Sequence, residues 1–132
     1  MKHILVTGGA GFIGSHTSIS LIECGYKVTI IDSHVNSSPL CLRGIKKVLN
    51  QKNSELNDFL DFQKGDIRDK KFLTKVFLNA QSKQQPIEAV IHFAGLKAVG
   101  ESVINPLIYW ENNVLGSISL IQVMKLFKCK TI

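Results

Sequence analysis

The chain has 132 residues, of which 45% are hydrophobic and 20% are charged, and its net charge is +6. This length suits one domain, and the composition excludes disordered, collagen-like and disulfide-scaffold proteins, so we expect a hydrophobic core. The basic residues are scattered without interleaved aromatic residues, and no apolar run approaches the ~20 residues of a membrane span. We therefore expect no nucleic-acid partner, no membrane partner and, because no leader precedes the first strand, a cytoplasmic location.

A metal site is also not expected. The three cysteines, Cys24, Cys41 and Cys129, are odd in number and share no CxxC spacing, which indicates reduced thiols. The histidines His3, His16 and His34 lack partners at metal-ligand spacing, and we expect His92 to point into the core.

The chain begins with a pattern typical of a strand, a helix and a second strand. His3 to Val6 is a β-branched apolar run that ends at a Thr-Gly-Gly turn, which predicts a strand buried on both faces. A helix is predicted from Phe12 to Cys24, with Gly25 as its stop and one inward stripe formed by Ile13, Thr17, Leu21 and Cys24. Lys27 to Ile31 reads as a second buried strand that ends at Asp32. Together they form a βαβ unit with parallel strands.

The rest of the chain continues this alternation. We expect helices from Ser38-Pro39 to about Leu49, from Asp69 to Asn79 and from Pro106 to Phe127, and strands at Phe59–Gln63 and Ala89–Phe93. Residues 50–58 are expected to be irregular, and Cys129 to Ile132 reads as the first step of another strand. The pattern predicts an α/β fold with a Rossmann-type doubly wound parallel sheet, truncated before the fifth strand.

The last predicted helix is unusually apolar. Of the 22 residues from Pro106 to Phe127, 13 are apolar, which is more than one stripe facing a single sheet requires. We therefore expect two of its faces to need cover. With the edge of the fourth strand open as well, we expect the chain to form dimers or larger species.

The segment TGGAGFIGS, from Thr7 to Ser15, carries the clearest functional signal. It has the spacings GxGxxG and GxxGxxG, and it lies between the first strand and the first helix. Glycines at such a turn let a pyrophosphate approach the backbone, and the following helix directs free N–H groups toward it. Asp32 follows Gly14 by 18 residues, near the offset expected of the carboxylate that binds the adenosine ribose. Since that carboxylate repels a 2′-phosphate and Ser33 places no arginine beside it, NAD is favoured over NADP.

Three segments carry a family resemblance: VTGGAGFIGSHT (6–17), GDIRD (65–69) and IHFAGLKAVGESV (91–103). On these residues the chain resembles the amino-terminal part of the UDP-glucose 4-epimerases, members of the extended short-chain dehydrogenase/reductase family. The run HFAGLKAVGES is the specific one, because related sugar-nucleotide dehydratases and decarboxylases differ after this strand. The resemblance runs through essentially all 132 residues and implies one partial NAD-binding domain, 1–132, that lacks the substrate-binding region.

The resemblance also implies which residues bind NAD. The diphosphate would lie against Gly8, Gly11, Phe12, Ile13 and Gly14, and the adenosine ribose against Asp32 and the loop with Ser33, Asn36 and Ser37. That loop departs from the family, which commonly has Asn-Leu where this chain has Ser33-His34. Asp66 and Ile67 match the pair that flanks adenine. The remaining implied cofactor-binding residues are Phe93, Ala94, Gly95, Lys97 and Asn112.

The catalytic pair of that family, Tyr-x-x-x-Lys, does not occur in these 132 residues. Tyr26 is followed four residues later by Ile30, and Tyr109 by Asn113. In the intact enzymes the lysine lowers the pKa of the tyrosine, which then removes a proton from the sugar hydroxyl. We therefore expect this chain to be the cofactor half of an enzyme that interconverts UDP-glucose and UDP-galactose by transient oxidation at carbon four, and to be inactive alone. The intact enzyme would bind a UDP-hexose and form a homodimer. Two alternatives are another extended-family sugar-nucleotide epimerase and a non-catalytic NAD-binding module.

Overall fold

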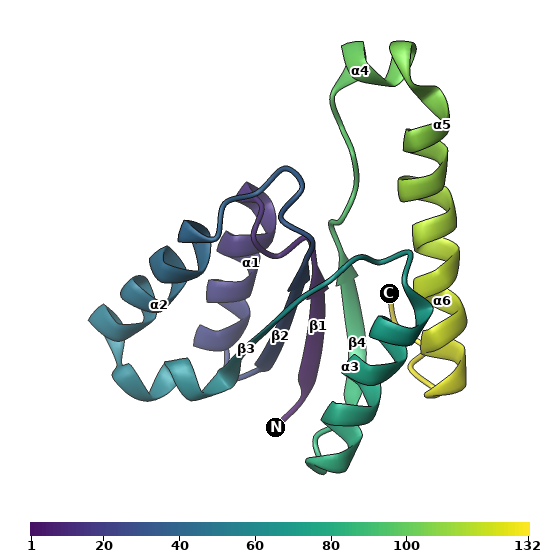
Figure 1. The fold of residues 1–132 in the computed structure, drawn as a ribbon. Coiled ribbons are helices and arrows are strands. Elements are labelled where there is room, and N and C mark those ends of the chain that lie inside the picture. The colour runs from purple at the N-terminus through teal and green to yellow at the C-terminus, as the bar shows by residue number, and fades with distance from the viewer.

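Four parallel strands form the centre of the computed structural model, which describes all 132 residues (Figure 1). They are β1 (His3–Thr7), β2 (Lys27–Asp32), β3 (Leu60–Lys64) and β4 (Ile87–His92), in the spatial order β3-β2-β1-β4. In the register of the sheet, Val6 of β1 lies beside Ile30 of β2 and Ile91 of β4. Because all strands are parallel, their carboxyl ends meet at one edge of the sheet. The Rossmann-type α/β fold predicted from the sequence is confirmed.

Helices cover both faces of this sheet (Figure 1). On one face lie α1 (Phe12–Glu23) and α2 (Leu40–Lys52), and on the other lie α3 (Lys70–Ser82) and α6 (Gly116–Leu126). A 3₁₀ turn (Ser54–Phe59) precedes β3. Beyond β4 the chain extends past the sheet, turns through α4 (Val99–Ile104) and returns through α5 (Pro106–Tyr109) and a π-helical turn (Trp110–Leu115) into α6. None of the helices is long and apolar enough to cross a bilayer.

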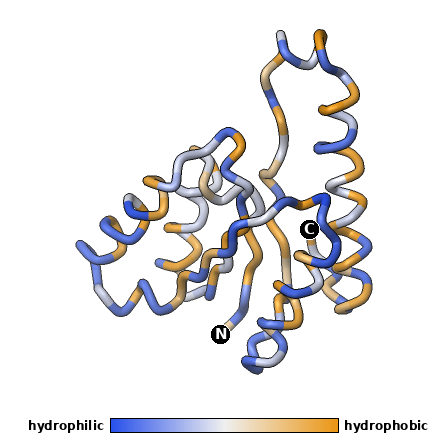
Figure 2. Tube along the Cα trace, in the orientation of Figure 1, coloured by the Kyte–Doolittle hydropathy of each residue, from blue (hydrophilic) through white to orange (hydrophobic).

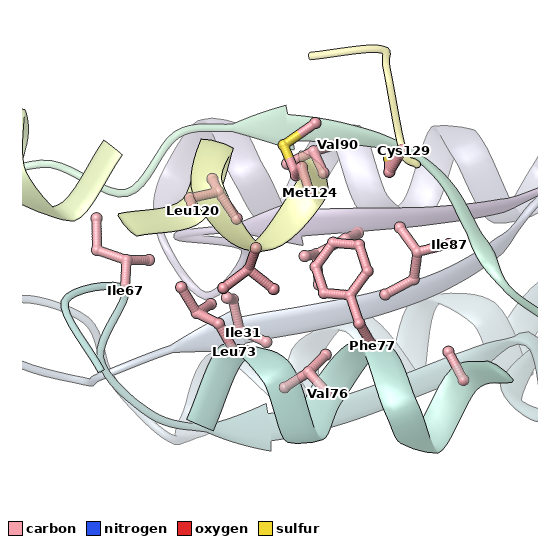
Figure 3. Close-up of a cluster of buried hydrophobic side chains, with 13 residues drawn as sticks. Ile31, Ile67, Leu73, Val76, Phe77, Ile87, Val90, Leu120, Met124 and Cys129 are labelled. Atoms are coloured by element: carbon pink, nitrogen blue, oxygen red, sulfur yellow. The ribbon is translucent and has the colours of Figure 1, made fainter. Parts of the chain in front are cut away.

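Alternation along the strands divides the hydrophobic core into two parts. On β1, Ile4 and Val6 point toward α1 and α2, whereas Leu5 points toward α3 and α6. The cluster on the α3 and α6 face has 13 buried residues and is centred on Phe77, Leu73 and Leu120 (Figure 3). The cluster on the other face has seven buried residues. Both faces of the central strands are buried, as expected for a parallel sheet between two helical layers.

The predicted inward stripe of the first helix is confirmed at Leu21, which packs against the core, and is wrong at Ile13 and Cys24. Ile13 is 60% exposed and Cys24 is also exposed, while the buried positions of α1 are Gly14, Ser18 and Ile22. The reason is the close approach of the helix to the turn after β1, which requires small residues on the inner face. The Ser18 hydroxyl donates to the carbonyl oxygen of Gly14 at 2.7 Å and so remains satisfied inside the protein.

Several boundaries also differ from the prediction. The fourth strand begins at Ile87, directly after Pro86, and ends at His92 instead of Phe93. The expected irregular segment 50–58 is partly helical, because α2 continues to Lys52 and the Asn53 side chain then accepts the N–H of Glu55 at the start of the 3₁₀ turn. The helix predicted from Pro106 to Phe127 forms, with a π turn that the hydrophobic pattern does not indicate.

The prediction that the last helical stretch has more apolar residues than the sheet can cover is confirmed. Five of them are exposed at steps of three, four, four and three residues: Leu107, Trp110, Val114, Ile118 and Ile121. We call them the exposed stripe. Figure 2 shows hydrophobic positions recurring along the whole of this stretch. The inner face of α6, with Leu120, Val123 and Met124, packs on the sheet, so the exposed stripe is additional to the core face.

The predicted start of a fifth strand is confirmed by a single parallel bridge between Thr131 and Ala89. The N–H of Val90 donates to the carbonyl oxygen of Thr131 at 2.9 Å. This contact lies on the edge of β4 opposite β1, where the next strand of a doubly wound sheet is placed.

Candidate functional site

The turn after β1 is built so closely that only glycine fits at two of its positions. Gly8 has φ +65°, and a Cβ placed on it would lie 2.7 Å from the backbone nitrogen of Ala94. A Cβ on Gly14 would collide with the carbonyl oxygen of Gly8 and lie 2.7 Å from Cα of Gly9. These contacts bring the start of α1, the end of β1 and the segment after β4 together at the carboxyl edge of the sheet.

The amino terminus of α1 presents unpaired backbone donors at this turn. Gly11 precedes the helix without a side-chain cap, and the first intrahelical bond runs from the N–H of Ser15 to the carbonyl oxygen of Gly11. The N–H groups of Phe12, Ile13 and Gly14 therefore have no partner within the helix. Such donors, together with the partial positive charge of about +0.5 at a helix amino terminus, suit an anion such as a diphosphate.

Asp32 ends β2 and is only 8% exposed. Its Oδ2 accepts the N–H of Ala10 at 3.0 Å, and its Oδ1 accepts the N–H of His34 at 2.9 Å. The Ser37 hydroxyl also donates to Oδ1, at 2.8 Å. The carboxylate is therefore fixed between the glycine-rich turn and the loop after β2, with lone pairs remaining for a further donor.

The loop after β2 is organised around this carboxylate. His34 adopts φ +60°, a left-handed conformation, and its Nδ1 lies 2.9 Å from the Ser37 hydroxyl oxygen. Because Ser37 gives its one hydrogen to Asp32, the Nδ1 of His34 is the donor in that contact. Ser37 thus supports Asp32 and is not part of the pocket lining, whereas Ser33 and Asn36 line the pocket.

Asp66 and Ile67 follow β3. Asp66 forms a two-point ion pair with Arg68, in which Nη2 donates to Oδ2 at 2.7 Å and Nε contacts both oxygens at 3.1 Å. The hydrogen bond from Arg68 lowers the pKa of Asp66 below its ordinary value. Ile67 is buried against Gly116 of α6, where a Cβ would lie 2.7 Å from its Cδ1, so only part of its side chain reaches the pocket.

These segments enclose a pocket of about 280 Å³ at the carboxyl edge of the sheet. Thirteen of the sixteen residues predicted to bind the cofactor line it: Gly8, Gly11, Phe12, Asp32, Ser33, Asn36, Asp66, Ile67, Phe93, Ala94, Gly95, Lys97 and Asn112. The lining does not include Ile13, Gly14 or Ser37. The side chain of Ile13 points into solvent because it lies on the outer face of α1, while Gly14 is a packing contact beneath the turn.

Four further lining residues were not predicted: Ile31, Val35, Gly65 and Leu96. Each is a direct sequence neighbour of a predicted residue, so the predicted segments could have indicated them. Gly65 is required by packing, because a Cβ there would collide with the ring of Phe72.

Behind the pocket, His92 joins β4 to β1 and α6 through a directed chain of hydrogen bonds. The Ser117 hydroxyl donates its one hydrogen to the carbonyl oxygen of Asn113 at 2.5 Å and therefore accepts the Nε2–H of His92, at 2.9 Å. The Nδ1 of the neutral ring then accepts from the Thr7 hydroxyl at 2.6 Å, and Thr7 also accepts the N–H of Ala94 at 3.1 Å. This chain requires a neutral imidazole, and burial lowers the pKa of His92. The prediction that His92 points inward is confirmed.

The free energy of unfolding should fall as the pH drops below about 6.5, the ordinary pKa of histidine. Burial lowers the pKa of both His3 and His92, so below that pH the unfolded chain takes up protons that the folded chain resists. Asp66 does not contribute in this window, since its lowered pKa affects stability only below about 4. Urea unfolding at pH 7.5 and 5.5 measures the effect. His92→Gln should reduce the difference between the two pH values and His16→Gln, at an exposed position, should not; an equal reduction would contradict the assignment.

The sequence matches the protein-family model described as GDP-mannose 4,6 dehydratase over residues 5–132. The chain belongs to this family. Within it, UDP-glucose 4-epimerase 2 of Arabidopsis thaliana is 44% identical over 131 residues, which are 99% of this chain and 35% of that protein. The UDP-glucose 4-epimerase of Neisseria meningitidis is 48% identical over 124 residues, 94% of this chain and 33% of that protein.

A solved member of the family has the same fold. The UDP-glucose 4-epimerase from Bifidobacterium longum, in complex with NAD+ and UDP, superposes with a TM-score of 0.83 at 40% identity and covers 98% of this chain and 35% of that one. The resemblance to UDP-glucose 4-epimerases drawn from the sequence is thus confirmed. The chain spans about a third of the length of these relatives.

Proposed function

We propose that this chain is the NAD-binding part of a UDP-glucose 4-epimerase, an enzyme of galactose metabolism. The observation that carries the proposal is the pocket itself, in which a glycine turn, a buried carboxylate at the end of β2 and the small residues after β4 converge. The similarity to epimerases, including one solved with NAD+ and UDP, supports the same assignment.

The residues present fit a dinucleotide. The turn has no room for a Cβ at Gly8 or Gly14 and leaves backbone donors at the start of α1 for a diphosphate. Asp32 would accept the hydroxyls of the adenosine ribose, and Lys97 and Asn112 would lie toward the second nucleoside. When bound, NAD supplies a hydride acceptor for the transient oxidation of a UDP-hexose at carbon four. The role of this chain is to bind and orient the cofactor and to shield it from water.

Asp32→Ala should weaken NAD binding about 10- to 100-fold, because hydrogen bonds to a charged group are worth roughly 1.5–3 kcal/mol. The preference for NAD over NADP should narrow in the same variant, since the charge that repels a 2′-phosphate is removed. Calorimetry with NAD and NADP measures both effects.

Two further variants make this test specific. Asp66→Ala should weaken NAD and NADP about equally, and Asp58→Ala, at an exposed carboxylate outside the pocket, should leave both unchanged. An unchanged NAD/NADP ratio in Asp32→Ala would remove the reason for naming NAD.

The epimerase activity is proposed for a longer protein in the cytoplasm, of which residues 1–132 form the cofactor domain. A Tyr-x-x-x-Lys pair is required for the sugar chemistry and does not occur in this chain. Turnover of UDP-galactose by the purified chain would contradict this division of roles. The alternatives are another sugar-nucleotide epimerase and a non-catalytic NAD-binding module. A Tyr-x-x-x-Lys encoded in frame after codon 132 would favour an enzyme over the module.

The chain should also associate with a second copy through the exposed stripe on α5, the π turn and α6. Leu107 is 74% exposed, Trp110 63% and Ile121 51%, and they lie on one side of the same helical stretch. An apolar surface of this length is typical of an interface. Light scattering at several concentrations should show dimers or larger species for the wild type and a shift toward monomer for Ile118→Glu. A concentration-independent monomer mass for the wild type would exclude this interface.

A further inference from the structure

Three polar side chains of the long helical stretch hold the segment that forms one wall of the pocket. Tyr109, Asn113 and Ser117 lie four residues apart, and they contact Ala98, Leu96 and His92 respectively. The chain runs away from the sheet after β4 and returns along the helix, so the two pieces lie side by side (Figure 1). We call these three contacts the ladder.

Asn113 makes the strongest rung. Its Oδ1 accepts the N–H of Leu96 at 2.8 Å, and its Nδ2 donates to the carbonyl oxygen of Leu96 at 2.9 Å. The Tyr109 hydroxyl accepts the N–H of Ala98 at 3.2 Å, and its one hydrogen faces both the Ala98 carbonyl oxygen at 2.9 Å and Oε2 of Glu101 at 2.8 Å. Leu96 and Ala98 lie outside the sheet, and the side chains of Asn113 and Tyr109 contact their backbone N–H and C=O groups instead of a neighbouring strand.

The π turn aligns these side chains. In a regular α-helix, positions four apart are offset by about 40° around the axis and positions eight apart by about 80°. The wider π turn from Trp110 to Leu115 reduces the rotation per residue and so keeps Tyr109, Asn113 and Ser117 on one side. The axial spacing also fits for Tyr109 and Asn113, because four helical residues rise about 6 Å and the two extended residues between Leu96 and Ala98 span about 6.6 Å. Ser117 instead contacts the side chain of His92, at the end of β4.

The ladder determines which backbone groups are free for a ligand. In an extended segment, the N–H and C=O groups of successive residues point to opposite edges. Since those of Leu96 and Ala98 are bound to the helix, those of Gly95 and Lys97 point away from it, and both residues line the pocket. The lowest rung, Ser117 with His92, continues through His92 to Thr7, the residue before Gly8.

The ladder lies on the side of the pocket away from Asp32. The strand order places β2, which ends at Asp32, and β4, which leads into the wall, on opposite sides of β1. A dinucleotide with its first ribose at Asp32 and its diphosphate at the glycine turn would bring its second nucleoside against residues 93–97.

We infer that Asn113, supported by Tyr109, is a positioning residue that sets the wall Phe93–Lys97 for the second nucleoside of a dinucleotide. This inference rests on the proposed NAD binding. It assigns to Asn113 a role distinct from that of Asn112, which lines the pocket itself.

Calorimetry with NAD and with AMP, which has only the adenylate half, tests the inference on the full chain. Asn113→Leu removes the two hydrogen bonds to Leu96 and the one from Nδ2 of Asn112, so it should weaken NAD about tenfold and leave AMP within about twofold. Amide hydrogen exchange should become faster at Leu96 and remain unchanged along α6. Gln122→Leu is the matched control, because it makes a similar change at an exposed position on the same stretch.

Tyr109→Phe gives a second test that preserves the ring and the fold. It should speed exchange at Ala98 and weaken NAD less than Asn113→Leu does. Two results in Asn113→Leu would overturn the positioning role. One is an equal loss of NAD and AMP affinity, and the other is an unchanged NAD affinity together with faster hydrogen exchange at the Leu96 amide. A wild-type chain that does not bind NAD would instead overturn the proposed function, and the inference with it.

Discussion

Gly14→Ala should abolish measurable NAD binding and lower the free energy of unfolding by about 3 kcal/mol, the upper end of the usual cost of overpacking. The added methyl group would collide with the Gly8 carbonyl oxygen and with Cα of Gly9, and both are backbone atoms that cannot rotate away. Helix α1 would have to move outward, which would displace the N–H groups of its first turn from the pocket. Calorimetry with NAD and urea unfolding measure the two effects.

Gly44→Ala is the matched control for this prediction. Gly44 lies inside α2, and a Cβ there would meet no atom within 4 Å. Alanine is favoured over glycine in a helix interior by roughly 0.5–1 kcal/mol, so this variant should be slightly more stable than the wild type and should bind NAD normally. Similar behaviour of the two variants would show that the close approach at Gly14 is not what restricts the site.

The strands and the first βαβ unit could be predicted because each signal is local. The apolar runs of β1 and β2 are bounded by Gly8 and Asp32, and these two residues also mark the site. Most residues of the pocket were predicted from the resemblance to the epimerase family, and strand ends alone indicate only where the pocket lies, since in a parallel sheet every strand ends at the same edge.

The buried face of α1 could not be predicted from apolar spacing. A stripe through Ile13, Thr17, Leu21 and Cys24 matches the helical period, but the helix turns Gly14 and Ser18 inward. The choice depends on the distance between α1 and the turn after β1, which is a tertiary property. The small size of Gly14 and Ser18 could have indicated the buried face, but an analysis of apolar spacing does not count small or polar residues as inward-facing.

The ladder was not predictable for a related reason. Tyr109, Asn113 and Ser117 have a four-residue spacing, but their partners are backbone groups of Leu96 and Ala98 and the ring of His92. Every residue has a backbone carbonyl and all but proline have an N–H, so the amino-acid sequence does not indicate which of these groups a side chain will contact. The π turn that aligns the three side chains has no hydrophobic signature either, so both features required the structure.

Phe77→Ala should cause the largest loss of stability, about 3–5 kcal/mol, which is the usual cost of truncating a buried aromatic residue. Phe77 is 2% exposed and lies at the centre of the 13-residue cluster between α3, α6 and the sheet (Figure 3). Its ring also stacks on Phe127, with centroids 5.2 Å apart and an angle of 29° between the planes. Urea unfolding at pH 7.5 measures the loss, which is a large share of the roughly 5–15 kcal/mol typical of a folded domain.

Leu78→Ala, at the next residue of the same helix, separates burial from helix propensity. Leu78 is 51% exposed, so its truncation removes little buried surface, and the expected loss is below about 1 kcal/mol. The consequences for the site differ in the same way. Phe77 supports the packing of α3 against α6, and α6 continues the helical stretch that carries Asn113, so a cavity at Phe77 should also loosen the wall of the pocket. Equal losses in the two variants would contradict a core centred on Phe77. A large loss in Phe77→Ala with the amide protection of Leu96 retained would show that the core and the pocket wall are energetically independent.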